Sequence, residues 1–135
     1  MNILIDTHCF LWSFIAPDRL NEDACNILTS GNDHLYFSAA SSWEIAIKVG
    51  IGKLRLPEPP AVYVPKRIAK RGLIGLPIEH AHALHVETLP AIHKDPFDRL
   101  LVAQAQIESL TLLTADTWVT KYGGSIIWAG SRQLS

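Results

Sequence analysis

Four acidic residues that lie far apart in the sequence occupy positions where a carboxylate can do chemistry. Asp6 closes the apolar run of residues 2–5, and Asp116 follows the apolar run of residues 111–114. Glu44 and Asp98 each fall near the start of a predicted helix. An aspartate at the end of a buried strand is disfavoured by strand propensity and by desolvation unless something pairs with it. Asp6 and Asp116 therefore favour a functional interpretation.

The chemistry expected of such acids, if they converge, is metal binding. Several ionised carboxylates within a few ångströms repel one another, which raises their pKa values or requires a cation. Oxygen ligands suit Mg²⁺ or Mn²⁺ better than zinc, and no cysteine or histidine occupies a matching position. The histidines include His80, His82 and His85, whose spacing does not present three ligands on one helix face, so we interpret them as surface or packing residues.

Helix capping is the structural alternative for some of these acids. Ser41 and Glu44 have the spacing of a capping box, and Asp95 can cap a helix whose first residue is Pro96. Asp98 would gain about 0.3–1 kcal/mol from the helix dipole without any function. We therefore favour capping for Glu44 and Asp95 taken singly, and leave Asp98 open between the two roles.

The elements that must position these acids alternate along the chain. Short apolar or branched runs predict strands at residues 2–6, 35–39, 73–78, 111–115 and 125–129. Helical patterns predict helices through Trp12 and around Trp118, and at residues 21–29, 41–50, 62–72, 79–89 and 96–110. Pro65 is expected in the first turn of its helix. This alternation predicts a parallel sheet covered by helices on both faces, with the acids at the carboxyl edge, where ligands bind.

Length and composition predict one domain over residues 1–135. The chain has 135 residues, 48% of them hydrophobic and 19% charged, which is typical of an ordinary globular protein. No apolar run approaches the ~20 residues that span a bilayer, so we expect a cytoplasmic protein. Cys9 and Cys25 are interpreted as buried thiols of a reducing compartment.

A basic segment stands out from the net charge of −1. Between residues 47 and 72 only Glu58 is acidic, and the basic residues are Lys48, Lys53, Arg55, Lys66, Arg67, Lys70 and Arg71. Such a patch can bind nucleic acid, and a solvated helix face explains its second half equally well.

Four motifs in order then match a known family. They are ILIDTH, SAASSWEIAIKVGIGKL, HKDPFDRLLVAQA and LLTAD, and with them the match extends from Ile3 to Trp128. On these residues the chain resembles the PIN-domain ribonucleases, and among them the VapC-like toxins of bacterial toxin–antitoxin pairs. The resemblance implies a three-layer α/β/α sandwich with a central parallel sheet.

The resemblance also assigns roles to individual residues. It implies that Asp6, Glu44, Asp98 and Asp116 are catalytic and bind the metal, with Asp95 as an accessory acid. Small hydroxyl residues beside the acids, which can orient a carboxylate or a water, are Thr7, Ser41 and Thr114. Arg99 is expected either to pair with Asp95 or Glu44 or to contact phosphate.

The activity implied by the resemblance is a Mg²⁺- or Mn²⁺-dependent endoribonuclease. Water would attack in line and leave a 5′-phosphate and a 3′-hydroxyl, with Asp98 or Asp116 as the base. The basic residues would form a rim that attracts RNA. The family further implies an antitoxin that fills the groove and inserts a basic side chain among the acids, and a homodimer.

Other functions remain to be weighed against this one. A dehalogenase-like phosphatase needs a second acid at position 8, which is His8, and a receiver domain needs an acidic pair that is absent here. The alternative that remains is a non-catalytic PIN-like module that binds RNA or an antitoxin. Trp12, Trp43 and Trp118 can serve an interface, although core packing is the commoner fate of tryptophan.

Overall fold

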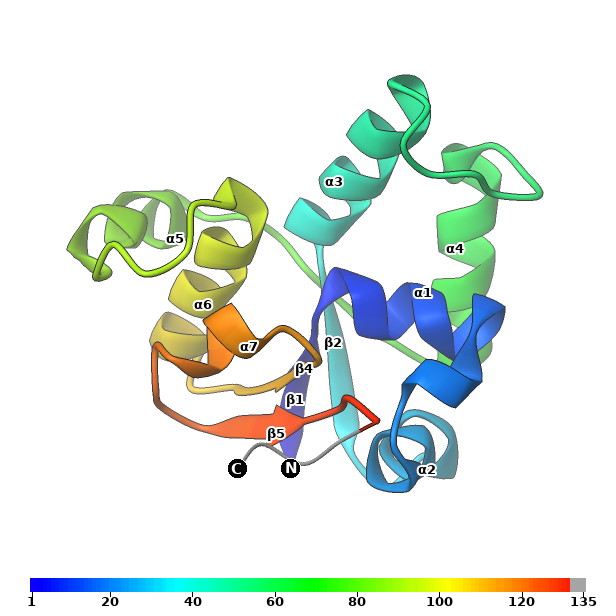
Figure 1. Ribbon diagram of the computed structural model, residues 1–135, viewed down its shortest axis with the longest axis horizontal. Coiled ribbons are helices and arrows are strands. Elements are labelled where there is room, and N and C mark those ends of the chain that lie inside the picture. The colour runs from blue at the N-terminus through cyan, green and yellow to red at the C-terminus, as the bar shows by residue number, and fades with distance from the viewer. Residues whose placement is uncertain (132–135) are drawn as a thin grey trace.

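The centre of the computed structural model, which describes residues 1–131, is a parallel β-sheet (Figure 1). Within these residues the sheet has five strands in the order β3-β2-β1-β4-β5, and every pairing is parallel. The strands are β1 (Asn2–Ile5), β2 (His34–Ser38), β3 (Ile74–Leu76), β4 (Thr111–Thr114) and β5 (Ile126–Trp128). The predicted parallel sheet is confirmed, with every strand within one or two residues of its predicted range.

Helices fill the connections between the strands. They are α1 (Thr7–Ile15), α2 (Glu22–Ser30), α3 (Ala39–Gly50), α4 (Pro60–Arg71), α5 (His80–His85), α6 (Pro96–Glu108) and α7 (Thr117–Thr120). Short 3₁₀ turns cover Pro17–Arg19 and Val86–Thr88, so the single helix predicted over residues 79–89 is in fact α5 followed by a 3₁₀ turn. No helix in this described part of the chain combines the length and hydrophobicity needed to cross a bilayer.

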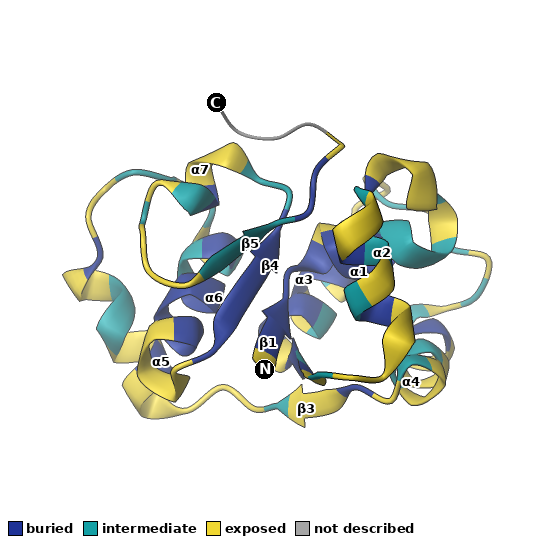
Figure 2. Cartoon of the chain, turned by 90° about the horizontal axis from the view of Figure 1, so that it is seen from below, coloured by how far each residue is buried: buried dark blue, intermediate teal, exposed yellow. Residues whose placement is uncertain are grey.

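The helices cover both faces of the sheet, which gives the three-layer α/β/α sandwich (Figure 1). Helices α1, α2 and α4 lie on one face, and α5, α6 and α7 lie on the other. Alternate residues of β1 serve the two layers: Ile3 and Ile5 join the core under α1, whereas Leu4 joins the core under α6. The central strands are therefore buried, while the edge strand β3 is largely exposed (Figure 2).

Helix α3 begins earlier than the sequence predicts. The predicted cap was Ser41, but β2 runs directly into the helix, and the Ser38 hydroxyl accepts a hydrogen bond from Ala40 N–H at 3.0 Å. The proposed capping box of Ser41 and Glu44 is therefore wrong. Because the helix starts at Ala39, Glu44 lies in its second turn, where its side chain is buried.

Helix α4 also begins before its predicted start at Val62. Pro60 occupies the first helical position, where the fixed φ of proline suits a helix. Pro65 consequently lies inside α4 rather than in its first turn, which corrects the prediction. The helix ends at Gly72, which has φ +63° and provides the left-handed terminating conformation.

Candidate active site

The carboxyl ends of β1 and β4 place Asp6 beside Asp116. Asp6 N–H still bonds Leu113 O in the sheet, and its carboxylate accepts hydrogen bonds from Cys9 N–H (2.8 Å) and the Thr114 hydroxyl (2.5 Å). Thr114 Oγ1 in turn accepts from Asp116 N–H at 3.1 Å. The buried hydroxyl of Thr114 thus binds both the carboxylate of Asp6 and the backbone of Asp116.

Helix α6 places Asp98 at the same edge. Asp95 caps the helix, because its carboxylate accepts from Phe97 N–H (2.8 Å) and Asp98 N–H (3.2 Å), and Pro96 follows at the first helical position. The predicted capping role of Asp95 is confirmed. Asp98, three positions after Asp95, is only 8% exposed. Because Asp95 holds the first turn, the Asp98 carboxylate has a fixed position inside the site.

Burial and neighbouring charge strongly affect Asp98. Its pKa rises from the ordinary 3.8 to about 8, first because burial penalises the charged form and then because of the charges of Asp95, Asp6, Asp116 and Glu44. The four acids expected from the sequence therefore lie close enough to interact through their charges. In the absence of a cation this cluster keeps a proton near neutral pH.

Glu44 enters the cluster from α3. It is 1% exposed; its Oε2 lies 2.5 Å from Lys48 Nζ, and its buried Oε1 has no hydrogen-bond partner. Burial alone would lower the pKa of Lys48, but the hydrogen bond and charge of Glu44, with the charges of Asp95 and Asp98, raise it. A buried carboxylate oxygen without a partner is costly, and a cation would satisfy it.

His93 also belongs to the site, and our sequence reasoning missed it. Its Nε2 lies 2.9 Å from Asp98 Oδ2 and 3.2 Å from Asp116 Oδ2. His93 lies in irregular structure ahead of the Asp95 cap, so no helical or strand periodicity reveals it. The available signal was its place in the HKDPFDRLL motif, five residues before Asp98.

The other supporting residues have structural contacts. Thr7 donates its hydroxyl hydrogen to Ser41 at 2.8 Å, which joins α1 to α3 rather than orienting a carboxylate. Arg99 donates to Pro90 O (2.9 Å), Val86 O (3.0 Å) and the Tyr122 hydroxyl (3.2 Å). The expected pairing of Arg99 with Asp95 or Glu44 is therefore wrong. Arg99 instead fixes the segment that leads to His93.

Of the basic residues, Lys48, Lys53 and Arg55 lie near the acids. They line a cleft of about 390 Å³ together with Thr7, Trp12 and Glu44. A smaller hollow of about 280 Å³ beside Asp6 and Asp116 shares His8 and Trp12 of α1 with this cleft. These two hollows give access to the acidic site.

The remaining basic residues do not lie at the acidic site. Lys66 and Arg67 both pair with Glu58, and the Arg67 guanidinium lies 3.8 Å from the centre of the Tyr63 ring. Arg71 donates to Ser13 O at 2.9 Å. Lys70 and Arg71 line a cavity with His34, the first residue of β2, so they lie at the amino edge of the sheet, opposite the acids.

The exposed tryptophans differ from the core packing considered for them. Trp43 is 56% exposed and packs edge-to-face on Phe97, and Trp118 is 50% exposed with Lys121 Nζ 4.4 Å from its ring centre. Trp43 directly precedes Glu44, its partner Phe97 directly precedes Asp98, and Trp118 lies two residues after Asp116. Trp12 is partly buried against the core.

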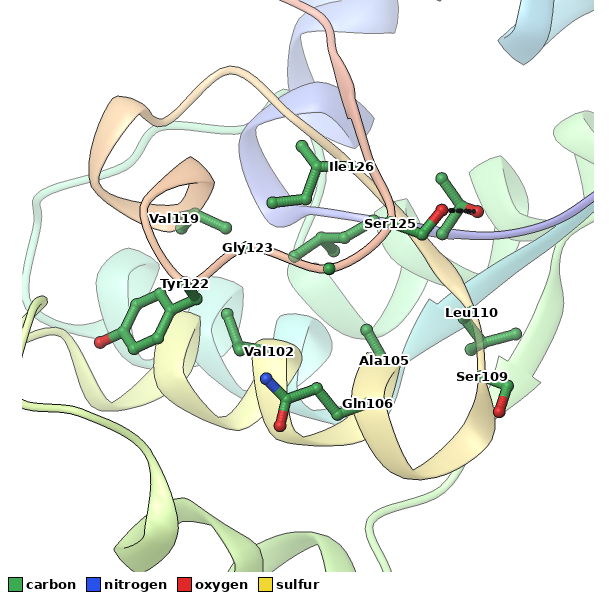
Figure 3. Close-up of a pocket in the computed structure, with 13 residues that line it drawn as sticks. Val102, Ala105, Gln106, Ser109, Leu110, Val119, Tyr122, Gly123, Ser125 and Ile126 are labelled. Carbon is green, nitrogen blue, oxygen red and sulfur yellow. Dashed lines mark hydrogen bonds between the residues drawn. The ribbon is translucent and has the colours of Figure 1, made fainter.

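Another cavity lies between α6, α7 and the strands β4 and β5 (Figure 3). It has a volume of about 310 Å³ and is lined mainly by apolar groups such as Val102, Leu110 and Val119. No Asp, Glu, His, Lys, Arg or Cys belongs to the described lining, which includes the start of β4. This cavity therefore holds no cluster of carboxylate, imidazole or thiol ligands for a metal and is distinct from the acidic site.

Comparison with known proteins identifies the family of this chain. The PIN domain family model matches residues 3–124. The chain belongs to the PIN domain family. Its PIN domain is 44% identical over 71 residues to "Ribonuclease VapC16" of Mycobacterium tuberculosis, a match that covers 53% of this chain. That match spans half the length (50%) of the relative.

Solved structures share the fold of this PIN domain. VapBC2 from Rickettsia felis, bound to a DNA fragment from its promoter, superposes with a TM-score of 0.70 at 14% identity over 96% of this chain and 99% of that one. A toxin–antitoxin complex from Klebsiella pneumoniae superposes with a TM-score of 0.65 at 16% identity, over 93% of this chain and 95% of that one. FitAcB from Neisseria gonorrhoeae superposes with a TM-score of 0.59 at 21% identity, over 92% of this chain and 95% of that one. The three-layer fold is thus that of the PIN domain.

Proposed function

We propose that this PIN domain, as one unit over residues 1–135, is a metal-dependent endoribonuclease and the toxin of a toxin–antitoxin pair. The observation that carries the proposal is the convergence of Asp6, Glu44, Asp98 and Asp116 at the carboxyl edge of the sheet. A protein with only a binding role has no need to gather buried carboxylates that repel one another. The 44% identity to a ribonuclease supports the same activity.

The residues present fit a divalent cation. The donors are carboxylate oxygens, and the Oε1 atom of Glu44 is buried without a partner. Burial, followed by the charges of neighbouring acids, raises the pKa of Asp98. We propose Mg²⁺ or Mn²⁺, held by Asp6, Glu44, Asp98 and Asp116. Such an ion supplies positive charge for the scissile phosphate and lowers the pKa of water.

The protein's own groups have separate tasks in this hydrolysis. Thr114 holds the carboxylate of Asp6, and Asp95 fixes the helix turn that carries Asp98. Asp98 or Asp116 takes the proton from the attacking water. The water oxygen bonds to phosphorus, the bond from phosphorus to O3′ breaks, and O3′ gains a proton. The products are a 5′-phosphate and a 3′-hydroxyl.

RNA reaches the acids along the basic cleft. An acidic pocket repels a polyanion, so cations at the rim must offset that repulsion. Lys53 and Arg55 have this position, and Lys48 neutralises part of Glu44. Lys66, Arg67, Lys70 and Arg71 are farther along α4 and contribute less in this proposal. Single-stranded or structured RNA suits such a site better than a duplex groove.

An antitoxin is the proposed protein partner. The relative and the structural neighbours include a ribonuclease of the VapC type and toxin–antitoxin complexes, which suggests the same pairing here. The cleft lined by Leu11, Trp12, Ile45 and Leu54 offers an apolar groove beside the acids. A basic antitoxin side chain entering from this groove would neutralise them. We further propose a homodimer that acts in the cytoplasm.

The test is cleavage of RNA by purified protein free of antitoxin. Total cellular RNA is incubated with Mg²⁺, with Mn²⁺ or with chelator, and the fragment ends are sequenced. We expect discrete metal-dependent fragments with 5′-phosphates from the wild type and none from Asp98→Asn. Asp23→Asn is the matched control, because Asp23 is an exposed acid at the start of α2. RNA binding without cleavage under either metal would instead establish the non-catalytic binding module.

A further inference from the structure

His93 has the distances of a metal ligand. Two adjacent ligands of one octahedral ion with bonds of about 2.1 Å lie about 3 Å apart. His93 Nε2 lies 2.9 Å from Asp98 Oδ2 and 3.2 Å from Asp116 Oδ2. One ligand atom from each of the three residues lies within 4.8 Å of the others. The three side chains are therefore spaced to share one ion.

The backbone that carries His93 is fixed before any ion binds. His93 N–H donates to the Tyr122 hydroxyl at 2.9 Å, and Arg99 donates to the same hydroxyl at 3.2 Å. Arg99 also binds Pro90 O at 2.9 Å. Residues of α6 and of the segment after α7 thus hold the imidazole against the two carboxylates. A ligand held in this way loses little conformational entropy on binding a metal.

A second observation points to a cation within the same acidic cluster. Glu44 is 1% exposed, comes from a different helix, and has a buried Oε1 atom without a hydrogen-bond partner. Its charge acts on Asp98. Lys48 satisfies only the other oxygen of Glu44. A metal between these side chains would supply the missing partner.

We propose that His93 binds the metal through Nε2, together with Asp98 and Asp116, so that the centre has mixed nitrogen and oxygen ligands. This inference rests on the proposed function, because it concerns the same metal site. Mg²⁺ prefers oxygen ligands and keeps its waters, whereas imidazole suits transition metals. A nitrogen ligand therefore shifts the preference of the site from Mg²⁺ toward Mn²⁺.

The hydrogen bonds of the ring allow this role. Asp95 N–H points to His93 Nδ1 at 3.5 Å, which is the upper limit for a hydrogen bond. Binding a metal through Nε2 places the ring hydrogen on Nδ1, so this contact has to open. Because the contact is long, its loss costs little compared with a new metal bond.

Pulsed electron paramagnetic resonance of Mn²⁺-loaded protein tests the proposal directly. The protein is prepared with histidine at natural abundance and with ¹⁵N-labelled histidine, in the absence of RNA. We expect a nitrogen coupling to Mn²⁺ that changes with the isotope in the wild type, disappears in His93→Gln and persists in His8→Gln. His8 is the matched control, because it lines the hollow beside Asp6 and Asp116 but is exposed.

Calorimetric titration gives a second readout. We expect His93→Gln to lower Mn²⁺ affinity at least about tenfold and to change Mg²⁺ affinity much less, so that the ratio of the two affinities falls. His8→Gln should leave the ratio unchanged. If His93→Gln does not fold, the wild-type spectrum still decides whether a histidine binds Mn²⁺, and His8→Gln tests the other histidine beside the acids.

Two results would overturn the inference. If no histidine nitrogen couples to Mn²⁺ in the wild type, the centre has only oxygen ligands. If His93→Gln binds both metals more tightly, His93 is a group that the metal displaces. Failure of the proposed function looks different, because the protein would then bind Mn²⁺ through His93 yet leave RNA intact.

Discussion

Two glutamates, each paired with a lysine, show how differently this molecule uses the same residue types. Glu58, in the loop before α4, receives Lys66 on one oxygen and Arg67 on the other, and these hydrogen bonds lower its pKa. Glu44, in α3, receives Lys48 on one oxygen only. Its second oxygen is buried without a partner.

The difference lies in whether the local structure balances the charge. Around Glu58, two cations meet one anion at the surface, which leaves nothing for a further ligand to satisfy. Around Glu44, Lys48 faces Glu44, Asp95 and Asp98 together, and burial raises the pKa of Asp98. A folded protein that maintains such an excess of buried negative charge has a place for a cation. The ion pairs of Glu58, in contrast, join the loop to α4.

Loss of RNA cleavage should separate the two glutamates most clearly. We expect Glu44→Gln to reduce metal-dependent cleavage by at least about 100-fold, because a metal ligand loses its charge. Glu58→Gln should leave cleavage unchanged, since Glu58 lies outside the acidic site. Single-turnover cleavage rates of the two variants at matched folded concentration measure the difference. Equal losses in both variants would show that the acidic edge is not the catalytic site.

The second prediction concerns how the stability of the protein depends on pH, which should reveal the buried Asp98 of the acidic edge. The pKa of Asp98 is about 8 in the folded protein, against the ordinary 3.8. Between these two pH values, the folded protein therefore binds more protons than the unfolded protein. The unfolding free energy therefore falls as pH rises through this window, by about 1.4 kcal/mol per pH unit for one proton. The stability that the folded protein gains by keeping Asp98 protonated is fully present below pH 3.8 and is lost above about pH 8.

Denaturant unfolding in chelator, with Asp98→Asn as reference, isolates this contribution. Asparagine stays neutral, so the wild type should lose stability relative to the variant as pH rises from about 4 to about 8. Saturating Mn²⁺ should reverse the trend, because the ion stabilises the charged carboxylate only in the folded protein. A constant difference between the two proteins across this window would mean that Asp98 ionises normally.

Thr114 offers a test of how the acidic edge is held together. Thr114→Val removes the hydroxyl that donates to Asp6 and accepts from Asp116 N–H, with little change in volume. We expect a loss of stability of about 1–3 kcal/mol and about 10–100-fold weaker metal binding. Thermal unfolding and calorimetry measure the two effects. Thr120→Val is the control, because its hydroxyl bonds only within α7 at Thr117 O; equal metal affinities in the two variants would contradict the role given to Thr114.

Much of the fold was predictable because the signals are local. The apolar runs that end at Asp6 and Asp116 are the central strands, and the Asp95-Pro96 pair begins α6 as expected. The start of α3 was not predictable from its hydroxyl residues alone. Ser38, which ends β2, serves as the cap, so the helix follows the strand directly, whereas the predicted ranges left Ala40 between them.

The errors at the site concern contacts between distant segments. Arg99 contacts Val86, Pro90 and Tyr122, none of which a helix pattern relates to it. His93 approaches Asp116 only because α6 and β4 bring their ends together. The acids themselves were predictable as a group, because parallel strands and the helices after them meet at one edge of the sheet.

The smallest effect is expected from substitution of the basic residues. A helix that connects parallel strands runs from the carboxyl edge back to the amino edge, so Lys70, at the end of α4, lies away from the acids. Lys53 and Arg55 precede α4 and line the cleft beside Glu44. The order along the chain thus separates cations that can reach RNA at the acidic site from those that cannot.

Salt dependence of RNA binding can test this separation in chelator, where the RNA stays intact. Replacing Lys53 and Arg55 by alanine removes two phosphate contacts, so the slope of log affinity against log salt should fall by about 1.4 for single-stranded RNA. Lys70→Ala should leave the slope unchanged. The opposite result would place the RNA at the amino edge of the sheet. Because the slope counts phosphates, it separates lost contacts from a general loss of folded protein, which lowers the apparent affinity equally at every salt concentration.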